Sequence, residues 1–257
     1  MSPRSRTLPV AVFVASVLAA CGGGGSSGQK DQPATSANPA AGLFSGTDSF
    51  GNPAAVLIAP GGTFASVVSL KSKPGDPYSV SIGAGQLTPL VFASSSLSTF
   101  DLDGGVATGA LTVSYTQGVQ IRADLAYANG TRTLVAQVLP NAYASIAGAS
   151  LPSSGAAAIY VPQTSRLATA LKGSWSYSSS GGTFSVVAGD CAVSGRAVPE
   201  VGLNALVLNA TPSAGCGVVS ALDGYAWNDT DKGVGYAVLA PSRSNVARTP
   251  MVIVLAR

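Results

Sequence analysis

Short apolar or alternating runs recur about every ten residues from Leu43 to the C-terminus, and turn-forming residues separate them. The chain's 31 glycines and its low share of charged residues, 10%, suit tight turns and short strands better than solvated helices. We predict strands at 54–59, 63–70, 78–82, 110–115, 119–127, 132–139, 174–177, 183–187, 192–197, 203–209, 217–222, 235–240 and 251–256. This spacing is typical of an antiparallel meander, so we expect an all-β fold of two related β-barrel or β-sandwich halves.

Some segments give finer expectations. Residues 119–125 alternate between apolar and polar side chains, which predicts a strand with one buried and one solvated face. The Asn129-Gly130 pair that follows is a two-residue hairpin signal. Residues 141–158 are rich in Ala, Ser, Gly and Pro and are interpreted as a loop, and one short helix is expected over 164–171.

A faint internal repeat suggests how the halves are related. The sequence GLFSGT at 42–47 precedes GGTF at 61–64, and GSWS at 173–176 precedes a second GGTF at 181–184. The spacings within the two copies differ, so chance similarity between hairpin sequences is the alternative.

The N-terminus has the pattern of an export signal. Arg4 and Arg6 precede an apolar run from Leu8 to Ala20, and LAAC at 18–21 leads directly into four glycines. This order of segments predicts a signal peptide over residues 1–20. A membrane-spanning helix is the competing interpretation, but it needs about 20 apolar residues and this run ends at the glycines.

The tetrapeptide LAAC resembles the lipobox of bacterial lipoproteins. The resemblance implies that Cys21 receives a diacylglyceryl group and becomes the acylated first residue. Several acyl chains would hold such a protein permanently, since each buried methylene contributes about 0.8 kcal/mol. Gly22 follows the cysteine, not the aspartate that resembles an inner-membrane retention signal, so the outer membrane is the expected address, with its leaflet undetermined. An ordinary secretory peptide with a chance cysteine is the alternative.

The expected domain organisation follows from these boundaries. Residues 22–41 contain no large apolar side chain, so we expect residues 21–41 to be the lipidated cysteine and a flexible tether. An N-terminal β domain over 42–155 and a C-terminal β domain over 156–257 would follow.

The chain resembles a group of two-part lipoproteins of unknown function from Gram-negative bacteria. The resemblance rests on the lipobox, the opening at 42–47, and the stretch GDCAVSG at 189–195 with Cys216. It spans most of the chain after Cys21, although Tyr177 stands where the family pattern has glycine. It implies a two-part envelope protein and no particular activity.

Two cysteines remain besides Cys21. In an exported protein, Cys191 and Cys216 most simply form a disulfide, and free thiols are the alternative. A metal site would lack its other soft ligands, so we expect neither a metal nor a cofactor.

The chain contains no histidine. This excludes Ser-His-Asp and Cys-His nucleophile systems and histidine-ligated metals. Glu200, the one glutamate, follows Pro199 and is interpreted as a solvated turn residue. The sequences DLDGG at 101–105 and NDTDKG at 228–233 lack the closing acid of a calcium loop, so both are interpreted as hairpin turns. We therefore expect no enzyme, with unrecognised carboxylate chemistry as the alternative.

The expected partners follow from charge and aromatic residues. The chain has 14 basic and 11 acidic residues, and removal of Arg4 and Arg6 with the signal peptide nearly balances them, so no nucleic acid is expected. Tyr225 and Trp227 lie on one face of a strand-like segment, where core packing is the default and a shallow aromatic site for an envelope protein or a glycan is the functional hypothesis.

The leading functional expectation is a non-enzymatic binding or structural protein that meets the membrane through its lipid anchor. An inhibitor of a host or rival hydrolase is the second hypothesis, with residues 223–233 as the protruding loop.

Overall fold

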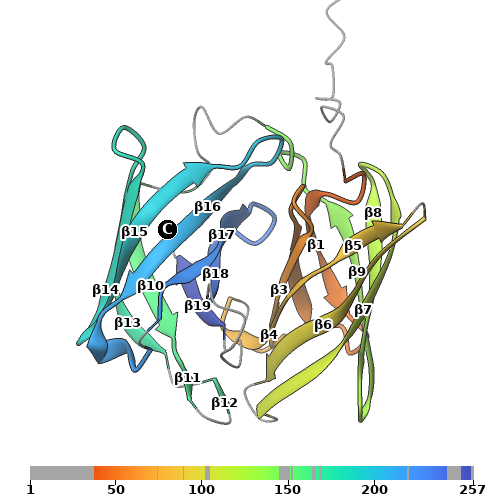
Figure 1. Ribbon diagram of the computed structural model, residues 1–257, viewed down its shortest axis with the longest axis horizontal. Coiled ribbons are helices and arrows are strands. Elements are labelled where there is room, and N and C mark those ends of the chain that lie inside the picture. Colours follow the sequence, from red (N-terminus) through yellow and green to blue (C-terminus); the bar gives the residue numbers. More distant parts are fainter. Residues whose placement is uncertain are drawn as a thin grey trace, which may run out of the picture. The chain divides into compact units, whose positions relative to one another are not determined.

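The computed structural model describes residues 38–73, 75–88, 90–101, 105–144, 151, 153–163, 166–167, 170–218, 220–241 and 250–255. These residues form two antiparallel β-barrels, which confirms the all-β prediction and selects barrels over sandwiches (Figure 1). The predicted signal peptide, Cys21 and most of the tether lie outside the described residues.

The first barrel is a meander that closes on itself. Its strands are β1 (Gly42–Asp48), β2 (Pro53–Ile58), β3 (Thr63–Ser69), β4 (Pro77–Ala84), β5 (Gln86–Thr88), β6 (Val91–Asp101), β7 (Gly105–Thr116), β8 (Gln120–Tyr127) and β9 (Gly130–Val138). Strands β1 to β4 and β6 to β9 each pair with their neighbours in sequence, β1 also pairs with β9, and a pairing between β4 and β6 completes the barrel. The short β5 adds a pairing to β6 only.

The second barrel repeats this order. Its strands are β10 (Ser154–Tyr160), β13 (Leu171–Ser178), β14 (Thr183–Ala188), β15 (Cys191–Pro199), β16 (Ala205–Pro212), β17 (Leu222–Asp229), β18 (Val234–Pro241) and β19 (Met251–Leu255). Pairing of β10 with β19 closes it. A two-stranded sheet of β11 (Pro162–Gln163) and β12 (Arg166–Leu167) lies between β10 and β13 in the chain, and a 3-10 turn, η2 (Ala214–Cys216), precedes β17.

The common topology locates the sequence repeat. Both GGTF segments open the third strand of their barrel, and their second glycines, Gly62 and Gly182, have φ values of 87° and 57° that other residues rarely adopt. The preceding segments do not correspond, because 42–47 lies in the first strand of its barrel and 173–176 in the second. Of the sequence repeat, only the GGTF turns therefore occupy equivalent positions in the two barrels.

Each barrel is filled by alternate side chains of its strands. In the first barrel, Phe64, Phe92 and Leu111 belong to the buried cluster of the lumen. In the second barrel, Trp175, Phe184 and Leu208 lie in the corresponding cluster. Eight strands enclose a lumen just wide enough for side chains to fill.

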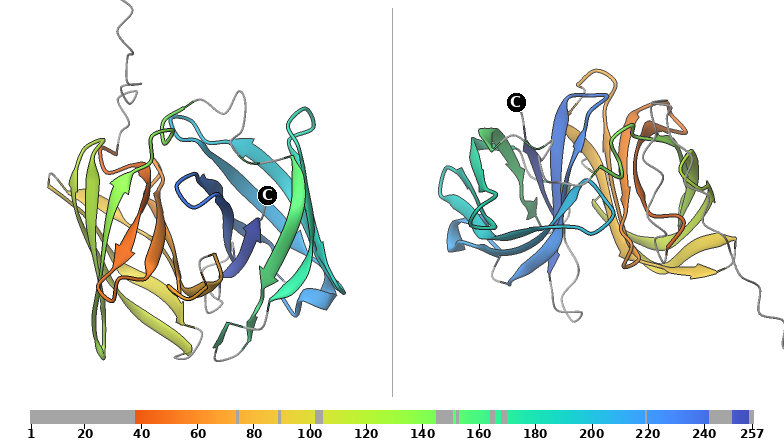
Figure 2. Two further views of the ribbon diagram at one scale, coloured as in Figure 1. Left: turned by 180° about the vertical axis from the view of Figure 1, so that it is seen from behind. Right: turned by 90° about the horizontal axis from the view of Figure 1, so that it is seen from above.

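A third apolar core joins the barrels, which stand side by side in Figure 2. It forms where outward-facing residues of β1 to β4 meet those of β16 to β19, and it includes Leu57, Val67, Trp227 and Val252. We call this contact the seam. Strands at the seam are buried on both faces, so β19 is a continuous apolar run, whereas β8 alternates buried and exposed residues.

Glycines allow close approach between curved strands of the second barrel. A Cβ at Gly173 would collide with the carbonyl oxygen of Val187, and one at Gly195 with that of Asn209. Both residues lie inside strands, where a glycine marks a tight bend.

The disulfide prediction is confirmed. Cys191 begins β15 and Cys216 ends η2, and their sulfurs are bonded with 4.4 Å between the Cα atoms. Both side chains are buried against the lumen of the second barrel.

Four local expectations need correction. The helix expected over 164–171 is wrong, because Arg166–Leu167 pairs with Pro162–Gln163 as a strand; eight residues are too few for a helix to form without tertiary support. The predicted loop at 141–158 extends too far, because β10 begins at Ser154. Of the strand expected at 217–222, only Leu222 is in a strand, as the first residue of β17; the described residues before it connect η2 to β17. No strand was expected at β6, whose serines hide its alternation.

The Asn129-Gly130 hairpin is present with a shifted turn. Tyr127 pairs with Gly130, so the turn residues are Ala128 and Asn129. The left-handed backbone is at Gly130, with φ of 140°, and no described non-glycine residue has a positive φ.

Candidate functional site

Trp227 lies in the seam and not on an exposed patch. Its side chain is fully buried, and its ring centroid lies 5.9 Å from that of Tyr236. Its indole Nε1 has no hydrogen-bond partner among the residues that the structure describes. The expected pairing of Tyr225 and Trp227 on one face is present, but the first barrel covers Trp227, so it offers no surface to a ligand.

Tyr225 is half-buried and lines a hollow at the edge of the seam. The hollow has a volume of about 250 Å³ and takes its walls from both barrels. Its lining is Thr63, Ile82, Gly83, Ala84, Val207, Asp223, Gly224, Tyr225, Ala240 and Pro241. One of the two residues expected to bind a ligand therefore does border a hollow.

The Tyr225 hydroxyl interacts with Thr63 of the first barrel and with Glu200 of the second. Burial raises the pKa of Tyr225, and the nearby Glu200 carboxylate raises it further. Burial also raises the pKa of Glu200, although bonds from Val201 and Tyr225 oppose this. Glu200 does precede a turn, as its position beside Pro199 suggested, but its side chain is partly buried and not fully solvated.

A second polar cluster joins the barrels at Lys232. The Lys232 Nζ lies 2.6 Å from Asp229 Oδ2, 2.8 Å from Ser45 Oγ and 3.0 Å from the carbonyl oxygen of Ala54. Ser45 Oγ also donates to Asp229 Oδ2 at 3.1 Å. The Asp229 side chain is fully buried and that of Lys232 is 17% exposed. We call these three side chains the clamp.

The clamp contains a serine beside a lysine, as serine–lysine catalytic pairs do, but its hydrogen bonds do not suit a nucleophile. A general base needs a lone pair directed at the hydroxyl it deprotonates. Lys232 instead points its nitrogen at three acceptors, which matches an ammonium donating all three protons. Ser45 gives its proton to Asp229, so the arrangement is that of a structural tie.

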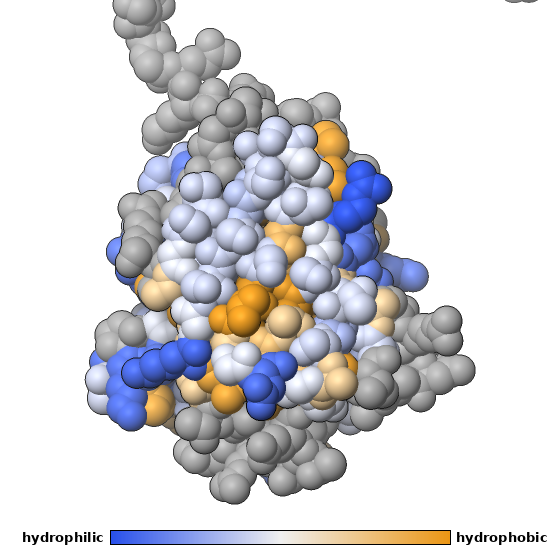
Figure 3. Space-filling model, turned by 90° about the vertical axis from the view of Figure 1, so that its left-hand side faces the viewer, coloured by the Kyte–Doolittle hydropathy of each residue, from blue (hydrophilic) through white to orange (hydrophobic). Residues whose placement is uncertain are grey.

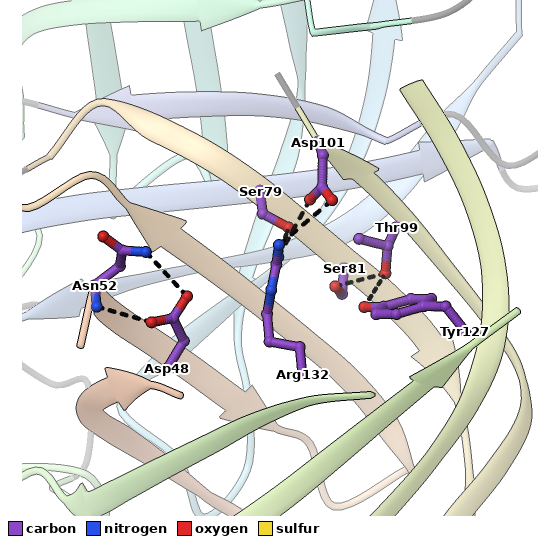
Figure 4. A network of polar contacts seen from close by, with 8 residues as sticks. All are labelled: Asp48, Asn52, Ser79, Ser81, Thr99, Asp101, Tyr127 and Arg132. Atoms are coloured by element: carbon purple, nitrogen blue, oxygen red, sulfur yellow. Dashed lines mark hydrogen bonds and ion pairs between the residues drawn. The ribbon is translucent and has the colours of Figure 1, made fainter. Parts of the chain in front are cut away.

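The polar network of the first barrel's lumen is shown in Figure 4. Arg132, on β9, reaches across to Ser79 Oγ at 2.6 Å and to the two oxygens of Asp101 at 3.2 and 3.4 Å. Its guanidinium carbon lies 5.7 Å from the centroid of the Tyr78 ring. Because β9 faces β4 and β6 across the barrel, Arg132 connects opposite walls.

Two smaller groups complete this network. The Thr99 hydroxyl is 2.7 Å from Ser81 Oγ and 2.9 Å from the Tyr127 hydroxyl, whose pKa burial raises. Asp48 accepts from the backbone of Phe50 and Asn52 and so holds the β1–β2 turn. These contacts between protein groups are typical of a structural network.

The segment expected to protrude as an inhibitory loop is packed into the seam. Residues 223–233 comprise most of β17 and its turn to β18, and Asp229 and Lys232 tie that turn to the first barrel. The NDTDKG sequence is indeed a hairpin turn. For the other calcium-like sequence, Asp101 pairs with Gly105 across a turn whose tip lies outside the described residues.

The outer wall of the second barrel is mixed in character. Figure 3 shows a small hydrophobic group among weakly polar residues, with strongly hydrophilic residues toward the edges of the view. Val187 and Val198 are about half exposed on β14 and β15. Single exposed valines are common on protein surfaces and indicate no particular site.

No known protein family, curated protein or solved structure matches the chain. In the part of the chain that the structure describes, no helix has the length and apolar character to cross a membrane. The same described residues contain no group of three or more Cys, Asp or Glu side chains placed to hold a metal ion.

Sequence reasoning missed the clamp and the Arg132 network. Ser45 and Lys232 are separated by 187 positions, and Arg132 and Ser79 by 53. Neither pair has a local signature. The one available signal was the spacing of three residues between Asp229 and Lys232. The sequence analysis explained this segment as a hairpin turn and did not consider an ion pair within it.

Proposed function

We propose that the protein is a lipid-anchored outer-envelope lipoprotein that acts by binding a ligand and not by turnover. The lipobox at 18–21 supports the anchor. The observation that carries the binding role is the hollow at the seam, which residues of both barrels line, Tyr225 among them. Sites between domains are common places for ligands.

Two features support binding without turnover. The described serine nearest to a lysine, Ser45, belongs to the clamp, where each proton already has an acceptor. Glu200, the acid with a raised pKa, bonds to Tyr225 and the backbone of Val201. Activity on ester, peptide or glycoside substrates that is lost on changing one residue of either barrel would contradict this part of the proposal.

The anchor is tested by Cys21→Ala in a Gram-negative host. We expect the unchanged chain to remain with the outer membrane after a high-salt wash and the variant to be released, because its acyl chains would be missing. A variant that still floats with the outer membrane would contradict the anchor.

The binding role is tested by filling the hollow. Ala84 is exposed at its edge, so Ala84→Trp should block it while leaving both barrels folded. Ala110→Trp, at an exposed alanine of β7 outside the hollow, is the matched control. We expect an envelope component bound by the unchanged full-length chain to be lost with Ala84→Trp and kept with Ala110→Trp. Equal binding by both variants would contradict a role for the hollow.

A further inference from the structure

We propose that the hollow at the seam binds an ammonium group carried on a short aliphatic chain, either as a free alkylamine or as a lysine side chain of a partner protein. This inference rests on the proposed binding function and names the chemistry of its ligand.

The walls of the hollow suit an aliphatic chain. Most of its side chains are apolar and come from both barrels: Ile82, Ala84, Val207, Ala240 and Pro241. Its volume of about 250 Å³ lies below the range of about 300–1,000 Å³ that is usual for drug-sized ligands. A chain of a few carbons matches this space better than a large ring system does.

The lining of the hollow carries a negative charge, because it includes Asp223 and no basic residue. The Asp223 carboxylate is exposed and accepts one hydrogen bond, 2.8 Å long, from the Asn209 side chain. A carboxylate has about four acceptor positions, so this bond orients Asp223 and leaves it able to accept from an ammonium.

The aromatic ring of Tyr225 adds a second attraction for a cation. Ring faces attract ammonium groups within about 6 Å of their centroid. Tyr225 lines the hollow together with Asp223. Glu200 interacts with the Tyr225 hydroxyl and adds a second acid near this residue. An apolar wall, one carboxylate and one aromatic ring together favour an alkyl ammonium over a neutral sugar, which needs more hydrogen-bond partners.

The test compares matched probes on the purified full-length chain by saturation-transfer NMR and equilibrium dialysis. The probes are pentylamine, its neutral counterpart 1-pentanol, methyl glucoside, and a short peptide with one lysine. We expect pentylamine and the peptide to bind, with weaker binding at high salt, and pentanol and the glucoside to bind more weakly. Stronger binding of the peptide than of pentylamine would indicate a protein partner as the source of the ammonium.

Variants assign the binding to the hollow. Asp223→Asn should weaken pentylamine about fivefold, as expected for a partly exposed ion pair, and Asp223→Lys should abolish binding. Asp124→Asn, on the β8 wall outside the seam, is the control and should change nothing. Equal binding of pentylamine and pentanol, equal affinity in Asp223→Lys, or preference for the glucoside would overturn the inference.

These results separate the inference from the function on which it rests. If no amine binds but Ala84→Trp still removes an envelope component, the ammonium assignment fails and the binding role of the hollow stands. If neither the probes nor an envelope component depends on the hollow, the proposed function fails as well.

Discussion

Lys232 shows how one side chain can hold two barrels together. It supplies the positive charge beside the fully buried Asp229, and its other contacts are to Ser45 and Ala54 of the first barrel. A buried carboxylate is costly unless it is paired and hydrogen-bonded. Lys232 neutralises Asp229 from within the same turn, and Ser45 of the first barrel adds a hydrogen bond, so the clamp both pairs the buried charge and ties this turn to the first barrel.

We predict that Lys232→Met destabilises the protein by about 3–5 kcal/mol, because it leaves the Asp229 carboxylate buried without a partner. The measurement is chemical unfolding at neutral pH. The double variant Asp229→Asn, Lys232→Met should recover much of the loss, since no charge then remains buried. Lys172→Met, at an exposed position of β13, is the control. A loss for Lys232→Met no larger than that of the control would contradict this view of the clamp.

The Glu200 carboxyl group should make the stability of the protein fall as the pH rises. Its pKa is raised in the folded state, so the native protein binds this proton more tightly than the unfolded chain does. The stabilisation from this proton is fully present below the pKa that Glu200 has in the unfolded chain. It is lost as the pH rises through the pKa that Glu200 has in the folded protein. Glu200→Gln should therefore be more stable than the unchanged chain near pH 7 and equal to it near pH 4.

The size of this effect is limited because Glu200 lies near solvent. We expect Glu200→Gln to raise the melting temperature near pH 7 by about 1–2 °C. Thermal unfolding across this pH range measures it. A variant that is less stable at pH 7, or equally shifted at both pH values, would contradict the assignment.

At the level of elements, glycine turns and the disulfide shape the barrels. The GGTF turn opens the third strand of both, and Gly173 and Gly195 let neighbouring strands approach closely. The disulfide joins the start of β15 to η2, a sequence separation of 25 residues. It therefore ties the turn before β17 to a strand two positions away in the barrel.

We predict that the double variant Cys191→Ala, Cys216→Ala loses about 3.5 kcal/mol, the chain-entropy value for a closed loop of this length. This corresponds to a fall in melting temperature of about 7–14 °C. Differential scanning calorimetry of the variant and of the reduced native protein should agree. A melting temperature unchanged by either treatment would contradict the prediction.

At the level of the whole molecule, the seam makes the two barrels depend on each other. Strands β2, β3, β18 and β19 have one face in a lumen and the other in the seam, so separating the barrels would expose a large apolar surface. Trp227 and Tyr236 are among the largest fully buried side chains. We therefore expect the barrels to unfold in one cooperative transition.

Trp227→Ala tests this coupling. Removing a fully buried tryptophan should cost about 3–5 kcal/mol and lower the single transition as a whole. Trp227→Phe should cost much less, because it also removes the unpartnered indole Nε1 proton, whose burial costs about 1–3 kcal/mol. Two separate transitions in calorimetry, with one unaffected by Trp227→Ala, would show that the barrels unfold independently.

Local sequence determined much of this protein. Alternation with a period of two placed most strands, and glycine turns separated them, because both signals depend on residues within a few positions. The pairing of Cys191 with Cys216 followed from there being two cysteines besides Cys21. Segments in which small or polar residues mask the alternation, such as β6 and β10, escaped prediction.

Tertiary structure decided what each apolar face contacts. Closure of the barrels depends on the pairings β1–β9, β4–β6 and β10–β19, which join distant segments without a local signal. These pairings and the seam together bury Trp227 between the barrels. They also place Tyr225 beside the hollow and bring Lys232 into contact with Ser45. The physical reason is that a strand's pattern fixes which residues share a face, whereas burial of that face depends on the partner that covers it.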